Sequence, residues 1–474
     1  MVFTSPTFLF LFLPLVLAGF FVTPQRLRTP LLVIASWVFY AWGEKHLVVL
    51  LALSTVINWA LALMLDRATA PNVRRMILTI AIVVNIGALL YFKYTNFLVL
   101  NVNALLDGAG LTSIGHVPVH LPIGISFVTF EAISYVVDVY RRQTPADRNP
   151  VHVAFYLSFF PHLIAGPILR FADIAAPLSR PIVALPALDL GVSRFINGLG
   201  KKMLLANPLG HVADQIFALS GAELSAPTAW LGIICYALQI YFDFSGYSDM
   251  AVGLGHMFGF TLPENFRLPY TAESIRDFWR RWHVSLSSWF RDYLFVPLGG
   301  NRVGRAKTYC NLLMVFLLCG FWHGASWTFI VWGLFHGTFL IFERTTFGMI
   351  VVDASPIIVR RVYTLFVVLV GWVFFRAETL SAAIEYLLAM LGIGSASATA
   401  VRPIYFLTIE VQIALIVGII LGLRPFQSQV ARLGPLMSAT VARGPQSVFQ
   451  LAVLALALLY VAAGTYNPFI YFRF

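Results

Sequence analysis

Charged residues are scarce in this chain, and their scarcity decides the first question about it. Only 11% of its 474 residues are charged, against about a quarter in an ordinary soluble domain, while 59% are hydrophobic. The mean hydropathy is +0.81. A soluble fold could not hide this much apolar surface, so the composition predicts a chain that lies mostly in lipid.

Apolar stretches long enough to cross a hydrocarbon core of about 30 Å recur along the sequence. Examples are Phe8 to Val22, Leu47 to Leu65, Met76 to Leu98 and Phe406 to Leu423. They lack the alternation of barrel strands, and in lipid the backbone must satisfy its own hydrogen bonds, so helices are predicted. We expect an all-α polytopic membrane protein with roughly ten to thirteen transmembrane and re-entrant helices.

Several familiar markers are missing as well. The three cysteines, Cys235, Cys310 and Cys319, have no metal-ligand or C-x-x-C spacing, which predicts neither a disulfide nor a metal site. No G-x-x-x-x-G-K-[ST] loop, H-E-x-x-H pair or G-x-S-x-G elbow occurs. NTP-driven transport, zincin hydrolysis and a hydrolase serine therefore lack their usual markers.

The net charge of +11 comes from Lys and Arg in short loops between apolar spans. This pattern indicates which loops face the cytoplasm, and it does not indicate a nucleic-acid partner. Arg74 and Arg141 lie in basic loops, whereas Thr95 to Tyr140 contains neither Lys nor Arg. Loops rich in Lys and Arg are predicted to be cytoplasmic, which places the N-terminus outside. No basic residue precedes Phe8, as a secretory signal peptide would require.

The chain is predicted to form one membrane domain, 1–474, because no flexible linker or repeat interrupts it. Plain N-terminal spans fill 1–120, and C-terminal spans fill 346–474. The segment 121–345 mixes Pro, Gly, Arg, Asp and His with apolar runs, so we expect function there. Broken helices around Pro122 and Pro161 predict an internal cavity or a re-entrant region.

The segment Glu273 to Tyr293 has the period of an amphipathic helix. Its polar stripe consists of Glu273, Arg276, Arg280, His283, Ser287 and Arg291. One interpretation is a cationic helix at the membrane interface, with arginines reaching head groups. The other is that His283 and the arginines face an anionic ligand such as a nucleotide-bearing thioester, since the planar guanidinium suits phosphate.

A histidine also stands in the apolar run Gly320-Phe321-Trp322-His323-Gly324. An ionisable group at membrane depth indicates function, although a histidine satisfied by a backbone carbonyl is the structural alternative. The two glycines would let another backbone or a substrate approach closely. We interpret His336 as a structural residue on the same long helix.

Two carboxylates, Asp243 and Asp249, lie six residues apart in a mostly apolar region. They could coordinate a cation, but ion pairing with the basic helix is the favoured interpretation. His162 is expected to help shape the cavity because it lies beside helix breakers.

Taken together, these motifs resemble the bacterial alginate O-acetylation branch of the membrane-bound O-acyltransferases. The segments that carry the resemblance are Leu121 to Phe127, His162 to Pro167, Asp243 to Asp249, Phe278 to His283, Leu298 to Arg302 and Trp322 to Gly324. The match runs from Met1 to about Arg344, and beyond about residue 350 it rests mainly on hydropathy.

The resemblance implies a ring of helices around a thinned central cavity, in a bacterial inner membrane. It implies catalytic histidines at His323 and His283. It further implies that an acetyl group passes from a cytoplasmic thioester, acetyl-CoA, to the periplasm, where a partner acetyltransferase places it on an exported polysaccharide such as alginate. Acetyl-CoA is then a substrate, and no permanently bound cofactor is expected.

The mechanism expected from these residues is acyl transfer with His323 as general base, because the pKa of neutral imidazole is ordinarily about 6.5. His283 is a candidate donor to the developing oxyanion. Substrate contacts are expected from Arg276, Arg280, Arg291, Asp243, Asp249 and Trp322, with membrane lipid as a competing ligand for the arginines. The alternatives are a transporter or channel for an anionic solute, or a non-catalytic scaffold for a periplasmic enzyme.

Overall fold

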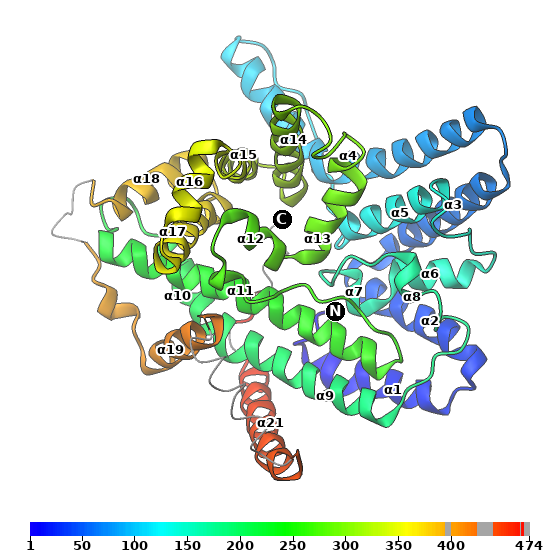
Figure 1. The fold of residues 1–474 in the computed structure, drawn as a ribbon. Helices are drawn as coiled ribbons and strands as arrows, with labels where there is room; N and C mark the ends of the chain where they lie inside the picture. The colour runs from blue at the N-terminus through cyan, green and yellow to red at the C-terminus, as the bar shows by residue number, and fades with distance from the viewer. Residues whose placement is uncertain (394–399, 424–438, 465, 469–474) are drawn as a thin grey trace. The chain divides into compact units, whose positions relative to one another are not determined.

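The computed structural model describes residues 1–393, 400–423, 439–464 and 466–468, and it is helical throughout these ranges. Figure 1 draws only helices and connecting segments. The one β-bridge in the described residues joins Leu224 to Val401. This confirms the predicted all-α class. The chain divides into two compact units, Met1–Val192 with Ala251–Pro263, and Ser193–Met250 with Glu264–Phe474. The expected subdivision at residues 120 and 345 stays a prediction.

The first unit begins with long apolar helices and then changes to short, broken ones, as the texture of its sequence indicates. Its helices are α1 (Leu13–Val22), α2 (Gln25–Glu44), α3 (Val48–Arg67), α4 (Pro71–Gly108), α5 (Ile125–Tyr140), α6 (Pro150–Ser158), α7 (Phe160–Leu163) and α8 (Phe171–Ile174). Helix α9 (Leu185–Gly200) crosses the boundary between the units, and so does α11 (Ala226–Met257).

The second unit holds most of the polar motifs. Its helices are α10 (Asn207–Phe217), α12 (Ile275–Arg281), α13 (Val284–Phe290), α14 (Arg305–His323), α15 (Trp327–Phe342), α16 (Thr346–Ala354), α17 (Ile357–Arg376), α18 (Leu380–Met390), α19 (Ile409–Leu423) and α21 (Ala439–Ala462). Two single-turn π-helices, η3 (Lys201–Ala206) and η5 (Arg291–Phe295), extend α9 and α13.

Within the residues that the structure describes, four helical stretches are long and apolar enough to cross a membrane: Gln25–Arg67, Pro71–Gly108, Ile357–Arg376 and Gly444–Ala462. They expose large apolar side chains along much of their length. Val83 and Tyr91 of α4, for example, are 62% and 57% exposed. Such surfaces are unfavourable in water and favourable against lipid chains, so these helices have the surface of membrane spans.

The hairpin of α14 and α15 places the histidine motif. The two helices are joined by Gly324 to Ser326, and glycines bring their backbones together. A Cβ at Gly320 would clash with the carbonyl oxygen of Phe329, and one at Gly333 would clash with that of Phe316. These pairs show that the helices run antiparallel. The small residues beside the motif therefore serve close packing with a neighbouring backbone, which was one of the two uses expected for them.

The prediction that His323 and His336 share one helix is wrong. Helix α14 ends at His323, and a new helix starts at Trp327 with the Ser326 side chain accepting a hydrogen bond from the Thr328 N–H. Serine at an N-cap satisfies a backbone donor that the first helical turn leaves open.

The prediction of one amphipathic helix over Glu273 to Tyr293 is also wrong. The chain leaves helix α12 at Trp282, and His283 adopts a left-handed conformation with φ 44° and ψ 56° before α13 begins. The break has a tertiary cause, because the backbone of Val284 donates a hydrogen bond to the carbonyl oxygen of Asn265.

Candidate active site

His323 is the last residue of α14 and lies in an aromatic enclosure. The residue is 6% exposed. Its ring centroid lies 4.9 Å from that of Trp322, and 5.1 Å from those of Trp332 and Phe375. The Trp332 and Phe375 rings meet the imidazole at 87° and 74°. Rings on several sides fix the orientation of the imidazole and exclude water from it.

Trp322 connects the two motif histidines. Its ring centroid lies 6.4 Å from that of His283 and 4.9 Å from that of His323. The side chain is 5% exposed. The structure therefore brings together three of the residues expected at the site, although they come from α14 and from the junction between α12 and α13.

His283 is held by a short network around Asn265. The Nδ1 atom of His283 lies 3.0 Å from Oδ1 of Asn265, and this oxygen also accepts hydrogen bonds from the backbone N–H and hydroxyl of Ser285. The Ser285 N–H fixes which end of the Asn265 amide is oxygen. Because that oxygen only accepts, Nδ1 of His283 must carry the proton.

The state of His283 follows from this contact and from burial. His283 lies outside the segments that can cross a membrane by length and composition, and it is 1% exposed. Burial lowers its pKa to about 3, so the ring is neutral at pH 7. Its Nε2 atom is then an acceptor, and it has no hydrogen-bond partner in the described residues. The oxyanion role expected for His283 needs an N–H at this position, which this tautomer does not supply.

Arg276 and Arg280 lie on the exposed side of α12, one turn apart. The buried side of the same helix carries Trp279, whose ring centroid lies 5.6 Å from that of Trp332. Trp332 in turn contacts His323. A continuous set of ring contacts thus connects the helix with the arginines to the motif histidine.

His336, interpreted from the sequence as a structural residue, also belongs to this set of ring contacts. It is completely buried, its ring centroid lies 5.1 Å from those of Trp279 and Trp332, and neither ring nitrogen has a hydrogen-bond partner in the described residues. A Cβ at Gly371 would lie 2.6 Å from its Nε2 atom. The spacing of Gly333 and Gly337 around His336 is the sequence signal that indicates a tightly packed helix face there.

The two aspartates are engaged elsewhere in the second unit. Asp243 lies 2.8 Å from Nζ of Lys202, and both side chains are at least 96% buried. Asp249 pairs with Arg194 at 2.9 Å and with Lys201 at 2.5 Å. The prediction that they pair with the basic helix of Glu273 to Tyr293 is wrong, since their partners lie on α9 and η3.

Arg291 begins η5, and its guanidinium binds the neighbouring Asp292, with Nε 2.7 Å from Oδ1. In the first unit His162 is fully buried, with Nδ1 3.1 Å from Oε1 of Glu131. No group of three or more His, Cys, Asp or Glu in the described part of the chain could hold a metal ion.

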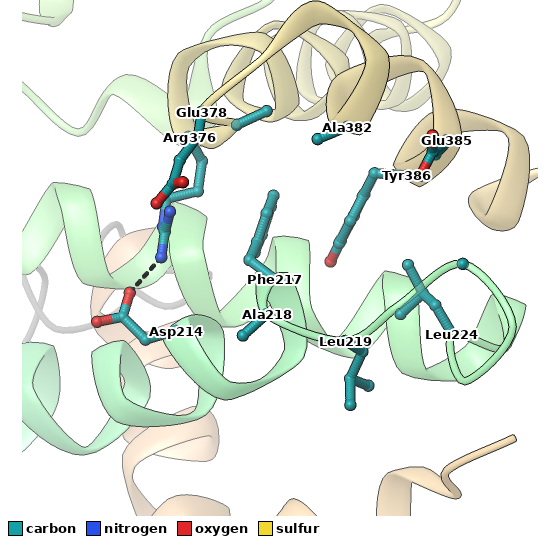
Figure 2. A pocket seen from close by; sticks show the side chains of 12 residues that line it. Asp214, Phe217, Ala218, Leu219, Leu224, Arg376, Glu378, Ala382, Glu385 and Tyr386 are labelled. Atoms are coloured by element: carbon teal, nitrogen blue, oxygen red, sulfur yellow. Dashed lines mark hydrogen bonds and ion pairs between the residues drawn. The ribbon is translucent and has the colours of Figure 1, made fainter. Parts of the chain in front are cut away.

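A cavity of about 270 Å³ lies near the C-terminal end of α17. Figure 2 shows Arg376 pointing to Asp214 at one side of the cavity, with the rings of Phe217 and Tyr386 lining it beside this pair. The cavity contains none of the expected site residues. Arg376, which lines the cavity, directly follows Phe375, whose ring contacts His323.

Comparison with known proteins shows the family of this chain. The model of the membrane-bound O-acyltransferase (MBOAT) family matches residues 72–377, which include every residue expected at the site. The chain belongs to the MBOAT family. It is an acyltransferase and a multi-pass membrane protein.

Three relatives show how far the similarity of this chain extends. The chain is 41% identical to the probable alginate O-acetylase AlgI of Azotobacter vinelandii over the whole of both chains. It is 37% identical to the peptidoglycan O-acetyltransferase of Helicobacter pylori over 84% of this chain and 81% of the relative. It is 29% identical to the teichoic acid D-alanyltransferase of Bacillus subtilis over 46% of this chain and 58% of the relative.

Proposed function

We propose that this acyltransferase moves an acetyl group from a cytoplasmic thioester, acetyl-CoA, to a hydroxyl on the periplasmic side of a bacterial inner membrane. The product serves O-acetylation of an exported polysaccharide such as alginate, with a periplasmic acetyltransferase as partner. The similarity to the probable alginate O-acetylase of Azotobacter vinelandii supports the acceptor class. The basic loops of the first unit support a periplasmic N-terminus.

The observation that carries the proposal is the enclosed imidazole of His323. A neutral imidazole with restricted orientation is suited to accept the proton of an acceptor hydroxyl as its oxygen attacks the thioester carbonyl. The new C–O bond then replaces the C–S bond, and the thiolate leaves with its electron pair. The proton on His323 returns to the thiolate or to solvent.

His283 has a second role in this scheme. Its free Nε2 atom accepts a hydrogen bond, so it can hold a second O–H group of the acceptor while the reacting hydroxyl donates to His323. Trp322, between the two histidines, then forms a wall of the acceptor position. Arg276 and Arg280 are left to bind the charged part of the donor.

A single assay tests the proposal. Membrane vesicles with and without the protein receive acetyl-CoA labelled in the acetyl group, together with the periplasmic partner and polysaccharide. We expect label in the polysaccharide only when the protein is present. Uptake of an anionic solute without acyl transfer would favour a transporter. Unchanged acetylation in the absence of the protein would contradict the proposal, and acetylation that needs the chain but not His323 would favour a scaffold.

A further inference from the structure

Three chain segments converge at the C-terminal end of α15, around the buried carboxylate of Glu343. This carboxylate accepts the backbone N–H groups of Ile275 and Arg276, at 2.5 Å and 3.0 Å. Glu343 is 3% exposed. Its charge is therefore used to fix the first turn of α12 against the end of α15, and the next residue, Arg344, lies beside that turn.

Arg344 also fastens the glycine loop that precedes α14. Its Nη1 atom donates to Oδ1 of Asn301 over 2.7 Å, and its carbonyl oxygen accepts the hydroxyl of Tyr309 at 3.3 Å. Its Nε atom is buried without a hydrogen-bond partner in the described residues. The side chain thus has a fixed position and an unused donor.

Positive charge accumulates at this point. Arg276 and Arg280 lie one turn apart on the exposed side of α12. Burial first, and then the positive charges of Arg276 and Arg280, lower the pKa of Arg344. Like charges held together are unfavourable unless an anion compensates them.

The neighbouring arginines show a different arrangement. Arg281 pairs with Asp277 at 2.9 Å and Arg360 with Glu273 at 3.0 Å. In the ranges that the structure describes, no carboxylate oxygen lies within 4 Å of the guanidinium nitrogens of Arg276, Arg280 or Arg344. Glu343, which precedes Arg344, accepts the backbone N–H groups of Ile275 and Arg276. Asp277, which follows Arg276, is the carboxylate that binds Arg281.

We propose that Arg276, Arg280 and Arg344 form an anion site for a phosphate group of the acyl donor, with Asn301 holding Arg344 in place. Guanidinium groups bind phosphate oxygens through two parallel N–H bonds, which suits a cluster of unpaired arginines. This inference rests on the proposed function for the identity of the donor. It adds Arg344 to the residues expected from the sequence, whereas Arg291 already binds Asp292.

The position of the site limits the kind of donor. Because α14 and α15 run antiparallel, Arg344 lies at the opposite end of the hairpin from His323. The 16 residues of α15 rise by about 24 Å, at 1.5 Å per residue. An acyl phosphate, whose phosphorus is one atom from the acyl carbon, cannot reach both ends. A thioester carried on a long arm that ends in phosphate can reach both His323 and the arginines.

Binding of free coenzyme A tests the site without any turnover. The purified protein in nanodiscs of zwitterionic lipid is titrated with coenzyme A. Arg344→Gln is expected to weaken binding roughly 10- to 100-fold, since a hydrogen bond to a charged group contributes about 1.5–3 kcal/mol. Arg344→Lys keeps the positive charge but loses the paired N–H donors of the guanidinium. Its affinity for coenzyme A should lie between those of the wild type and Arg344→Gln. Arg361→Gln, an exposed arginine 3.7 Å from Glu273, is the matched control and should bind as the wild type does.

A second measurement separates the donor from lipid as the source of the phosphate. Transfer is compared for acetyl-CoA and for acetyl-pantetheine, which has the arm but no phosphate. Arg344→Gln is expected to raise the KM for acetyl-CoA and leave that for acetyl-pantetheine unchanged.

Equal changes for both donors, together with a new dependence on anionic lipid, would assign the arginines to lipid head groups and overturn the proposal. Wild-type affinity for coenzyme A in a folded Arg344→Gln variant would overturn it as well. If coenzyme A binds through Arg344 but the wild type transfers no acetyl group, the anion site is supported and the proposed function fails.

Discussion

His283 shows at the scale of one residue how the site is constrained. Its left-handed backbone is uncommon for a residue other than glycine and costs about 1–2 kcal/mol. The contacts with Asn265 hold it there and fix its tautomer. In this conformation the neutral imidazole of His283, with Nε2 unbonded, contacts the ring of Trp322, which also contacts His323.

This arrangement predicts how stability depends on pH. In the unfolded chain His283 binds a proton below about pH 6.5, whereas in the fold its pKa is about 3. Between these pH values the unfolded state binds more protons than the folded state. The contribution of His283 to the free energy of unfolding therefore falls by about 1.4 kcal/mol for each pH unit of acidification. His283→Asn keeps a side-chain N–H and tolerates the left-handed backbone.

We therefore expect the melting temperature of the wild type in detergent to fall more between pH 7 and pH 5 than that of His283→Asn. An equal fall in both proteins would contradict a neutral, buried His283.

At the scale of elements, the contact of α9 and η3 with α11 depends on close glycine packing and on buried charge. A Cβ at Gly198 would lie 2.5 Å from the carbonyl oxygen of Gly246. The pair of Lys202 and Asp243 lies one turn further along. We assign this pair to the packing of the two helices, a role different from the substrate contact expected for Asp243.

Removing one partner of the pair tests that assignment. Asp243→Asn leaves a buried, uncompensated lysine and should cost about 3 kcal/mol of stability, while the donor KM of the remaining folded protein stays unchanged. The double variant Lys202→Met, Asp243→Leu should recover most of the lost stability, as replaced ion pairs often do. A raised donor KM in Asp243→Asn without loss of stability would instead show that the carboxylate binds substrate.

The elements also show what local sequence can predict. Long apolar runs gave the correct helices α3, α4 and α19, because hydrophobicity alone determines them. Ser326 is an N-cap signal that the sequence contains, so the start of α15 was predictable. The break at His283 was not, because its cause is Asn265, 18 residues earlier in the chain. The partners of Asp243 and Asp249 likewise come from a helix about 40 to 55 residues away.

At the scale of the whole molecule, the charge bias of the loops predicts an N-terminus outside and basic loops inside. Arg74 itself is buried, with Nη1 donating to the carbonyl oxygen of Leu65, so it is unsuitable for labelling. Arg75, Arg141 and Thr112 are exposed. Among the native cysteines only Cys310 is exposed, and it is replaced by serine in the test.

In sealed cells an impermeant thiol reagent should label Thr112→Cys and spare Arg75→Cys and Arg141→Cys. The latter two should react only after the membrane is opened. The reverse pattern would overturn the orientation, and with it the cytoplasmic position assigned to the donor.

The catalytic role of His323 is the central claim, and an acetylation assay with His323→Ala tests it most directly. Loss of a general base typically costs about 10²- to 10⁴-fold in rate. The variant should remain folded, because the enclosure is formed mainly by the rings of Trp322, Trp332 and Phe375. His336 is no neutral control, since it shares Trp332 with His323. His211→Ala, an exposed histidine of the same unit, serves instead.

The measurement is the rate of labelled acetyl transfer from acetyl-CoA at equal amounts of protein in the membrane, with melting temperature as the check on folding. The account predicts a loss of at least about 100-fold for His323→Ala and the wild-type rate for His211→Ala. Transfer at the wild-type rate by folded His323→Ala would contradict the account.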